Sequence, residues 1–299
     1  MPRRIIVSGA SGLIGSALVD GLRAGGDRVV TLVRRPARTS DEVEWLTDTR
    51  PLDPQVLEGA DAVVNLNGAS IGRIPWTPRY KSTLLWSRLT PTRTLATALR
   101  ALARDAPHFV SASAVGYYGS RPGRRLTEHD SAGEGFLARV SVEWEKAARG
   151  AGEAVALTTL RTAPVVHPEG VLSPLLTLTR LGLGGPIGRG TQVWPWIALT
   201  DEVAAIRFVI DRGLTGPVNL AGPERATAND LGFALARRMN KPFLLRAPTW
   251  ALRTALGRDM ADSVLTTDAH VVPEALQQAG FTFTHADVED AIAAVVPQP

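Results

Sequence analysis

The N-terminal half of the chain alternates short, nearly continuous apolar runs with longer segments whose apolar residues recur every three or four positions. The apolar runs predict buried strands at residues 4–7, 28–33, 61–66, 108–111 and 156–161. The periodic segments predict helices at about residues 16–23, 87–104 and 135–149. Strands without a polar face, separated by helices, are typical of a parallel sheet that helices cover on both sides. We therefore expect an α/β fold built on a doubly wound parallel sheet.

The pattern changes beyond about residue 165. Glycines fill a loop at 181–190, and short helical patterns follow from about 247 to 296. A single core is near its upper limit at 299 residues, so a second lobe is expected. We assign residues 1–240 to the sheet domain, with 165–200 contributing to a substrate lobe, and residues 241–299 to a smaller C-terminal lobe.

Two pairs of aromatic residues have the alternate spacing of an extended strand. Trp194 and Trp196 flank Pro195, and they suit either the wall of a substrate cleft or the core. In the first case the glycine-rich loop before them would close over the cleft. Phe281 and Phe283 share this spacing, and we expect them in the core of the small lobe.

Composition argues against several classes of protein. The 33 basic and 29 acidic residues give a formal charge of +4 and are spread along the chain, which argues against nucleic-acid binding. No apolar run approaches the ~18 residues of a membrane span, so no membrane partner is expected. The chain has no cysteine and its histidines lack ligand spacing, so no disulfide and no metal site are expected. The charged start is similar to a signal peptide, but glycines interrupt the apolar stretch behind it, and we expect a cytoplasmic protein.

The most informative segment joins the first predicted strand to the first predicted helix, and it spells G-x-x-G-x-x-G. Gly9 permits a tight turn, Gly12 lets the backbone approach a pyrophosphate, and Gly15 lets the helix pack closely on the sheet. The free N–H groups of the first helical turn then bind the anion. The strand before and the helix after indicate a Rossmann-like dinucleotide site. We expect cofactor contacts from Gly9, Ser11, Gly12, Leu13, Ile14 and Gly15.

The end of the second predicted strand bears on which dinucleotide is bound. NAD sites place an acidic residue there, about 20 residues past the glycines, to bind the ribose 2′-hydroxyl. This chain has Arg34 and Arg35 instead. Two guanidinium groups suit a 2′-phosphate, although exposed arginines are also common on ordinary surfaces. We expect NADP(H) as the cofactor, with its 2′-phosphate on Arg34 and Arg35.

Segments along almost the whole chain resemble the extended short-chain dehydrogenase/reductase superfamily. Residues 65–69, Asn-Leu-Asn-Gly-Ala, resemble its N-L-A-G cofactor segment, and residues 111–114, Ser-Ala-Ser-Ala, resemble its S-S-x-x segment. More narrowly, the chain is similar to an atypical branch, the epimerase-family proteins with an appended DUF1731 domain. The stretches that carry this similarity are 86–90, 113–119, 183–188, 194–201, 271–274 and 280–281.

The resemblance implies a nicotinamide dinucleotide along the carboxyl edge of the sheet and a small-molecule substrate between the two lobes. It implies that Leu66 and Asn67 line the path from adenosine to nicotinamide, with Gly68 also in contact with the cofactor. It further implies that Arg88 reaches toward the cofactor and that Val165 flanks the nicotinamide end. Members often pair through helices beside the site, which leaves a homodimer open.

The acid/base pair of the superfamily is missing from the expected helix. The superfamily uses Tyr-x-x-x-Lys, in which one helical turn places the ammonium below the phenol and lowers the pKa of the phenol. Here the corresponding positions are Phe136 with Val140 or Leu137 with Ser141, and neither pair exchanges a proton with a substrate. We expect the charged side chains further along to be a solvated face: Glu143, Glu145 and Lys146.

Three side chains near the site are candidates for its chemistry. Ser113 aligns with the substrate-positioning hydroxyl of the superfamily and is expected to orient a carbonyl. Tyr117 or Tyr118 is the candidate proton donor, although both also suit an ordinary aromatic turn. A tyrosine needs a nearby cation to act as a base at neutral pH. Two functions stay open. One is an NADP(H)-dependent oxidoreductase or epimerase-like enzyme with a non-standard proton donor, and the other is a non-catalytic NADP(H)-binding regulator that senses redox state.

Two further sequence patterns are not taken as catalytic sites. Residues 68–72 spell G-x-S-x-G, the nucleophile turn of many hydrolases, but that turn passes directly from strand to helix. Pro75 and Pro78 follow here, so we expect neither a helix nor a hydrolase. Asp201 and Glu202 are expected to begin a helix, where carboxylates suit the helix dipole.

Overall fold

The centre of the protein is a seven-stranded sheet in which all neighbouring strands run parallel. Its strands are β1 (Arg4–Ser8), β2 (Arg28–Val33), β3 (Glu42–Glu44), β4 (Ala62–Asn65), β5 (His108–Ala114), β7 (Leu157–Thr162) and β10 (Gly216–Leu220). They lie in the order β3-β2-β1-β4-β5-β7-β10, which confirms the doubly wound parallel sheet. The computed structural model describes residues 2–298, so Met1 and Pro299, the outer ends of the two expected domains, lie outside the described residues.

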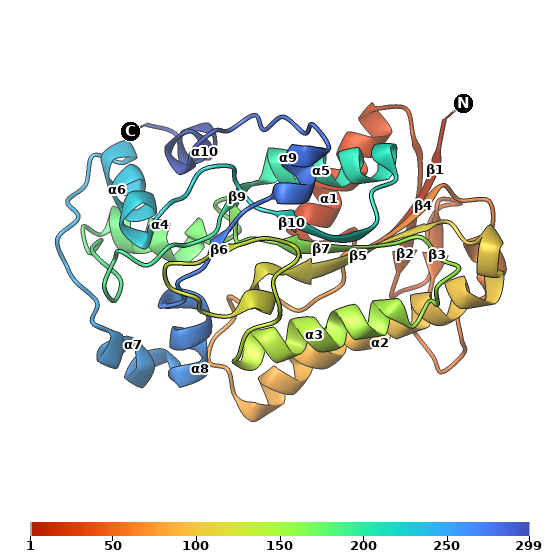
Figure 1. Ribbon diagram of the computed structural model, residues 1–299, viewed down its shortest axis with the longest axis horizontal. Helices are drawn as coiled ribbons and strands as arrows, with labels where there is room; N and C mark the ends of the chain where they lie inside the picture. The colour runs from red at the N-terminus through yellow and green to blue at the C-terminus, as the bar shows by residue number, and fades with distance from the viewer. Residues whose placement is uncertain (1, 299) are drawn as a thin grey trace.

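Two pairs of helices cover the two faces of the sheet (Figure 1). On one face lie α1 (Leu13–Ala24) and α5 (Leu199–Arg212), and on the other lie α2 (Pro78–Leu102) and α3 (Phe136–Arg149). The five strands between the two edges contribute to both cores because their side chains alternate. In β1, Ile5 and Val7 pack toward α1, whereas Ile6 packs toward α2. The apolar runs in the sequence follow from this double burial.

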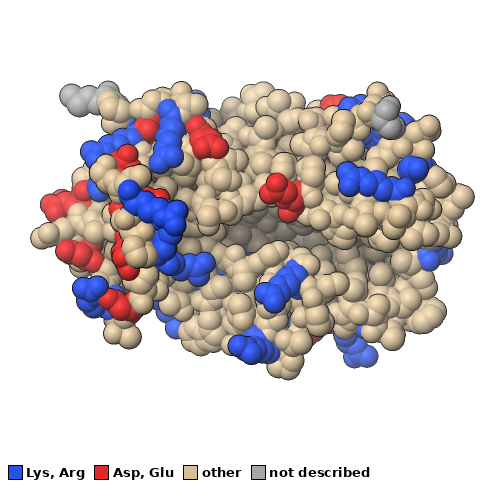
Figure 2. Space-filling view, turned by 180° about the vertical axis from the view of Figure 1, so that it is seen from behind, with Lys and Arg blue, Asp and Glu red and all other residues tan. Residues whose placement is uncertain are grey.

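Most of the remaining elements form a lobe beyond the carboxyl ends of β5 and β7 (Figure 1). The remaining helices are α4 (Leu172–Arg180), α6 (Ala228–Arg238), α7 (Thr249–Leu256), α8 (Arg258–Met260), α9 (Glu274–Gln278) and α10 (Val288–Val295). Two small sheets pair β6 (Arg125–Leu126) with β11 (His270–Val271) and β8 (Val165–Val166) with β9 (Ile197–Ala198). Figure 2 shows the opposite face hollowed between this lobe and the side that carries the N-terminus.

Trp194 and Trp196 are core residues of this lobe. Both are buried in one apolar cluster with side chains of α6 and α10. Of the two roles that the sequence left open, packing is the one observed. Phe281 lies outside that cluster, with its ring centre 5.3 Å from that of Phe208 on α5, and Phe283 packs on Phe281 at 4.8 Å. The expectation that Phe281 and Phe283 build the small lobe is wrong, because they extend the core around α1 and α5.

Two helices begin earlier than the sequence predicts. α1 starts at Leu13, directly after the glycine turn. α2 starts at Pro78, because the Thr77 hydroxyl accepts a hydrogen bond from the Tyr80 N–H and proline suits the first helical position. The expectation that Pro78 prevents a helix is therefore wrong. Ser70 still lies in irregular chain between β4 and α2, so it does not occupy a strand-to-helix turn.

Candidate functional site

The turn between β1 and α1, together with the first turn of α1, contains three glycines with different surroundings. A Cβ at Gly9, whose φ is +78°, would lie 2.6 Å from the Leu66 carbonyl carbon, and a Cβ at Gly15 would overlap the Gly9 carbonyl oxygen. The Cβ position of Gly12 has only that same oxygen nearby, at 3.5 Å. The turn is therefore packed against the protein at Gly9 and Gly15 and open at Gly12.

The open side of this turn presents backbone donors. Gly12 is the N-cap of α1 and supplies no side chain to the N–H groups of the first helical turn. Ser11 and Gly12 are exposed, whereas Leu13 and Ile14 are half-buried. A helix N-terminus of this kind attracts an anion through its N–H groups and its dipole. The residues at this turn fit a pyrophosphate that approaches Gly12.

A buried amide network fixes the segment that follows β4. The Asn67 amide nitrogen donates to the Ser8 hydroxyl at 2.7 Å and to the Asn65 side-chain oxygen at 2.9 Å. The Asn65 amide nitrogen in turn donates to hydroxyls on α2 and β5. Asn67 therefore points into the protein, so a ligand in the crevice would meet the backbone of residues 66–68 rather than the Asn67 side chain.

Arg88 fixes the chain at Gly68 and Ala69, which follow Asn67. Its guanidinium donates to the carbonyls of Leu84 and Ala69, at 2.8 and 3.1 Å, and lies 5.0 Å from the centre of the Trp144 ring. Burial lowers the pKa of Arg88 to about 10, so it stays charged at neutral pH. Its bonds within the described part of the chain are to carbonyls, with no carboxylate among them. Such a cation, directly behind Gly68, suits an anionic ligand.

The two arginines after β2 have different environments. Both Nη atoms of Arg35 donate to the Glu42 carboxylate, at 2.8 and 2.6 Å. Hydrogen bonds from Arg35 and from the Arg38 N–H lower the pKa of Glu42 to about 2, so this pair is ionised at neutral pH. Arg34 is exposed and makes no side-chain bond within residues 2–298. Arg34 is therefore the freer of the two guanidinium groups to bind a phosphate.

Val165 lies at the same edge of the sheet as the glycine turn before α1. It is nearly buried in β8 and pairs with Ile197 of β9. The chain then turns at Gly170, where a Cβ would lie 3.5 Å from Leu13 Cδ2 and close to the Val165 carbonyl. The structure therefore brings Val165, predicted to flank the cofactor, close to the start of α1.

The candidate catalytic side chains lie at the end of β5 and in the turn that follows it. Tyr118 is fully buried, its hydroxyl donates to Asn219 Oδ1 at 2.7 Å, and burial raises its pKa to about 12. A phenol held in this way does not reach a substrate, which removes Tyr118 from the candidates. Tyr117 is half-buried, so it remains.

A buried ion pair lies beneath this turn. Arg161 of β7 donates to both oxygens of Glu145 on α3, at 2.8 and 3.1 Å, and these side chains are only 4% and 3% exposed. The Ser113 hydroxyl donates to the same carboxylate at 2.8 Å, and the Arg161 guanidinium lies 3.6 Å from the centre of the Tyr117 ring. Burial has the largest single effect and lowers the pKa of Arg161, but Glu145 and Tyr118 together outweigh it through hydrogen bonds and charge, so the pKa is raised. The expectation that Glu145 is solvated is wrong, because Arg161 compensates its charge inside the protein.

The structure also distinguishes the two alignments of α3. A Cβ at Gly116, in the turn after β5, would lie 3.2 Å from Leu137 Cβ and 3.9 Å from Ser141 Oγ. Phe136 instead packs against Trp76, with ring centres 5.6 Å apart. Leu137 and Ser141 are therefore the pair that faces the turn, and α3 contains no tyrosine.

The buried network continues into the C-terminal segment. Asn219 of β10, which accepts the Tyr118 hydroxyl, donates through its amide nitrogen to the Val272 carbonyl at 2.9 Å. Glu128 Oε1 accepts the N–H groups of Asn219 and Ala275, at 3.0 and 3.2 Å. Sequence reasoning missed the charged and amide members of this network: Glu128, Glu145, Arg161 and Asn219.

A further buried carboxyl lies in the first turn of α5, where the helix start at Asp201 and Glu202 is confirmed. One oxygen of Glu202 accepts the Thr162 hydroxyl at 2.8 Å, and the other has no partner among the described residues. Burial raises the pKa of Glu202 to about 8, so it is mostly protonated at pH 7. Asp201 accepts the N–H groups of Thr284 and His285, at 2.7 and 3.1 Å. These carboxyls therefore hold chain segments together rather than simply face the helix dipole.

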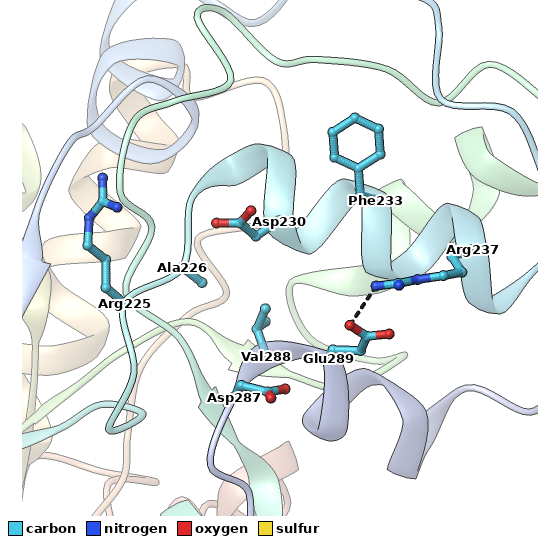
Figure 3. A pocket seen from close by; sticks show the side chains of 8 residues that line it. All are labelled: Arg225, Ala226, Asp230, Phe233, Arg237, Asp287, Val288 and Glu289. Carbon is cyan, nitrogen blue, oxygen red and sulfur yellow. Dashed lines mark hydrogen bonds and ion pairs between the residues drawn. The ribbon is translucent and has the colours of Figure 1, made fainter.

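A small cavity in the lobe is lined by none of the candidate cofactor or catalytic residues (Figure 3). It has a volume of about 270 Å³ between α6 and α10. Figure 3 shows Arg237 paired with Glu289 across it, at 2.5 Å, and Phe233 pointing away from α10. Residues 2–298 contain no cluster of three or more side chains able to hold a metal ion. Within the same range, no helix combines the length and apolar character needed to cross a membrane.

Family sequence models match two parts of the chain. The model of the NAD dependent epimerase/dehydratase family matches residues 5–221, which include all seven strands of the central sheet. The chain belongs to this family. A domain of unknown function, DUF1731, matches residues 247–295. The resemblance seen in the sequence is therefore confirmed.

Individual relatives agree with this assignment. The epimerase family protein Mb2239 of Mycobacterium bovis is 41% identical over 300 residues, which span 99% of this chain and 98% of its own length. The solved structure of the human epimerase family protein SDR39U1 (isoform 2) with NADPH is 26% identical, has a TM-score of 0.88 and covers 98% of this chain and 99% of its own. A nucleoside-diphosphate sugar epimerase from Corynebacterium glutamicum is 30% identical, with a TM-score of 0.79, over 99% of this chain and 58% of its own.

Proposed function

We propose that this protein is an NADP(H)-dependent oxidoreductase or epimerase-like enzyme that acts on a small-molecule substrate. The observation that carries the proposal is the glycine turn before α1, which is open at Gly12 and leads into a helix without a side-chain cap. The human relative with the same fold, whose structure was solved with NADPH, supports the choice of cofactor.

The proposed cofactor contacts divide among three segments. The N–H groups at the start of α1 bind the pyrophosphate, and the backbone of residues 66–68 lies along the dinucleotide, with Arg88 behind it. Arg34 binds the 2′-phosphate, while Arg35, already paired with Glu42, braces the segment after β2. When bound, the nicotinamide supplies or accepts a hydride.

We propose Tyr117 as the proton donor. A cation lies beside this tyrosine, since the Arg161 guanidinium is 3.6 Å from the centre of its ring. Ser113 is 3% exposed and donates its hydroxyl proton to Glu145, and among the described residues its oxygen accepts no hydrogen bond, so it could accept one from a substrate hydroxyl that reaches the end of β5. Ser113 would therefore orient the alcohol form of a substrate, with Tyr117 nearby.

The second function is a non-catalytic regulator that binds NADP(H) and senses redox state. One observation favours it: the two α3 positions that face the turn after β5 carry Leu137 and Ser141, and neither side chain moves a proton at neutral pH.

Thermal unfolding with NADPH, with NADH and without either cofactor tests the shared part of both proposals. A ligand that binds only the native state raises the melting temperature, and we expect the larger rise with NADPH. No rise with either cofactor would overturn both functions.

A panel of carbonyl compounds and nucleotide sugars then separates them, with reduced nicotinamide followed by absorbance. Turnover that Tyr117→Phe abolishes and Tyr118→Phe retains supports the enzyme. NADPH binding without turnover across the panel supports the regulator.

A further inference from the structure

Seven large apolar side chains stand exposed on the lobe beyond the carboxyl ends of β5 and β7. The most exposed are Leu244 at 78%, Trp250 at 72% and Leu181 at 67%. Of the other described residues, only Ile74 and Trp86 are large apolar side chains of comparable exposure. We call the seven residues the apolar ridge: Leu178, Leu181, Leu183, Phe233, Leu244, Leu245 and Trp250.

Segments distant in sequence run side by side in the central part of the ridge. The N–H groups of Leu244 and Leu245 both donate to the Gly184 carbonyl, at 2.9 and 3.1 Å. Phe233 on α6 joins them through Phe243, whose ring centre is 4.4 Å from its own. Figure 1 shows the connection between α6 and α7 running along the outer edge of the lobe. Leu244 and Leu245, which belong to this connection, therefore lie at the outer edge of the lobe.

The segments that carry most of the ridge are basic. Residues 172–200 and 240–258 contain no aspartate or glutamate. Arg180, Lys241 and Arg246 are exposed in these segments, close in sequence to ridge residues. Figure 2 shows the face opposite to the one in Figure 1. On the half of this face that carries the lobe, acidic side chains are few.

We propose that the apolar ridge docks this protein on a membrane surface that contains anionic lipids. Leucine and tryptophan side chains would enter the boundary between headgroups and acyl chains, and the three cations would contact lipid phosphates. Docking of this kind needs no spanning helix. The proposal revises the expectation that the protein has no membrane partner, and it is independent of the proposed enzymatic function.

The geometry favours a membrane over two other occupants. A groove for a peptide would half-bury its lining, whereas Leu244 and Trp250 are more than two-thirds exposed. A second copy of this chain packed ridge against ridge would bring Arg180, Lys241 and Arg246 close to like charges, since the neighbouring carboxylates, those that line the cavity beside Phe233, lie at one end of the ridge.

Co-sedimentation of the full chain with vesicles tests the proposal. One set of vesicles contains phosphatidylcholine and phosphatidylglycerol in equal parts, and the other contains phosphatidylcholine alone. We expect binding to the anionic vesicles that falls with added salt. Lys241→Glu changes the charge by two units and should weaken this binding by about 25-fold, since each unit of charge near an anionic surface contributes about five-fold.

The double variant Leu244→Ser with Trp250→Ser should lose binding, whereas Trp86→Ser on α2 serves as the matched control and should retain it. Thermal melting checks that all variants fold. Absence of wild-type binding to anionic vesicles overturns the proposal, as does equal loss in the Trp86→Ser control. A wild-type dimer that the double variant converts to a monomer, without vesicle binding, assigns the ridge to a second copy instead.

Discussion

The buried pair of Arg161 and Glu145 lends itself to a quantitative test. Arg161→Met removes the guanidinium and leaves the Glu145 carboxylate bonded only to the Ser113 hydroxyl. Loss of one partner of a buried ion pair costs about 3–5 kcal/mol, because the remaining charge is uncompensated. Arg149 lies 3.7 Å from Glu145 but is 58% exposed, so it compensates part of that charge. We therefore expect a loss of about 3 kcal/mol in the free energy of unfolding.

Urea unfolding, with linear extrapolation to water, measures this loss. Arg3→Met is the matched control, because Arg3 also makes two bonds to a carboxylate, that of Asp27, at the far end of β1. The Arg3 side chain is 30% exposed, so water takes over part of its role and we expect a cost of about 1 kcal/mol.

A double variant tests whether burial of charge is the cause. Arg161→Met combined with Glu145→Leu removes both charges and should recover much of the stability lost by Arg161→Met alone. Two results would refute the conclusion that Arg161 and Glu145 compensate each other's charge in the protein interior. One is a loss of unfolding free energy in Arg161→Met no larger than that in Arg3→Met, and the other is a double variant that is no more stable than Arg161→Met.

Three other predictions address the rest of the molecule. Arg34→Ala should weaken NADPH binding about 10- to 100-fold in calorimetry and leave NADH binding nearly unchanged, and equal weakening of both would count against a 2′-phosphate contact. Gly15→Ala should abolish NADPH binding or folding, read by circular dichroism and thermal shift, because the new Cβ overlaps the Gly9 carbonyl oxygen. Burial raises the pKa of Glu202 from 4.5 to about 8, so the folded state holds a proton that the unfolded chain releases. Stability should therefore fall as pH rises from about 5 to 8, by at most ~1.4 kcal/mol per pH unit, and Glu202→Gln should remove this slope in urea titrations at several pH values.

The parts of the fold that the sequence predicts are those fixed by local chemistry. The apolar runs of β1, β2 and β5 are visible because helices cover both faces of the sheet. β3 escapes detection because it has only three residues, two of them glutamate, and forms the edge of the sheet. β10 begins with Gly216 and Pro217, residues that usually indicate a turn, and pairing with β7 overrides that preference.

Glu145 shows where reasoning about charge fails. Ser141, Trp144 and Ala148 are buried on α3, and Glu145 follows Ser141 by four positions, so the helical spacing alone places it on the inner face. From the sequence we assign Glu145 to the solvent-exposed face, because the sequence does not indicate a cation that could pair with it inside the protein. The partner, Arg161, stands on β7, and the alternation within a strand does not reveal which cation meets which carboxylate.

The cofactor-binding part of the candidate site can be predicted from the sequence, whereas the catalytic part cannot, and the difference has a physical reason. The cofactor half rests on backbone shape at Gly9, Gly12 and Gly15, which a glycine pattern after a strand specifies locally. The other half rests on side chains that meet only after β5, β7 and α3 have packed, so no spacing along the chain encodes it. The contact of Arg161 with Tyr117, and of Glu145 with Ser113, follows from that packing. A site without the Tyr-x-x-x-Lys spacing can therefore still place a cation beside a tyrosine, by using a strand residue in place of a helix residue one turn away.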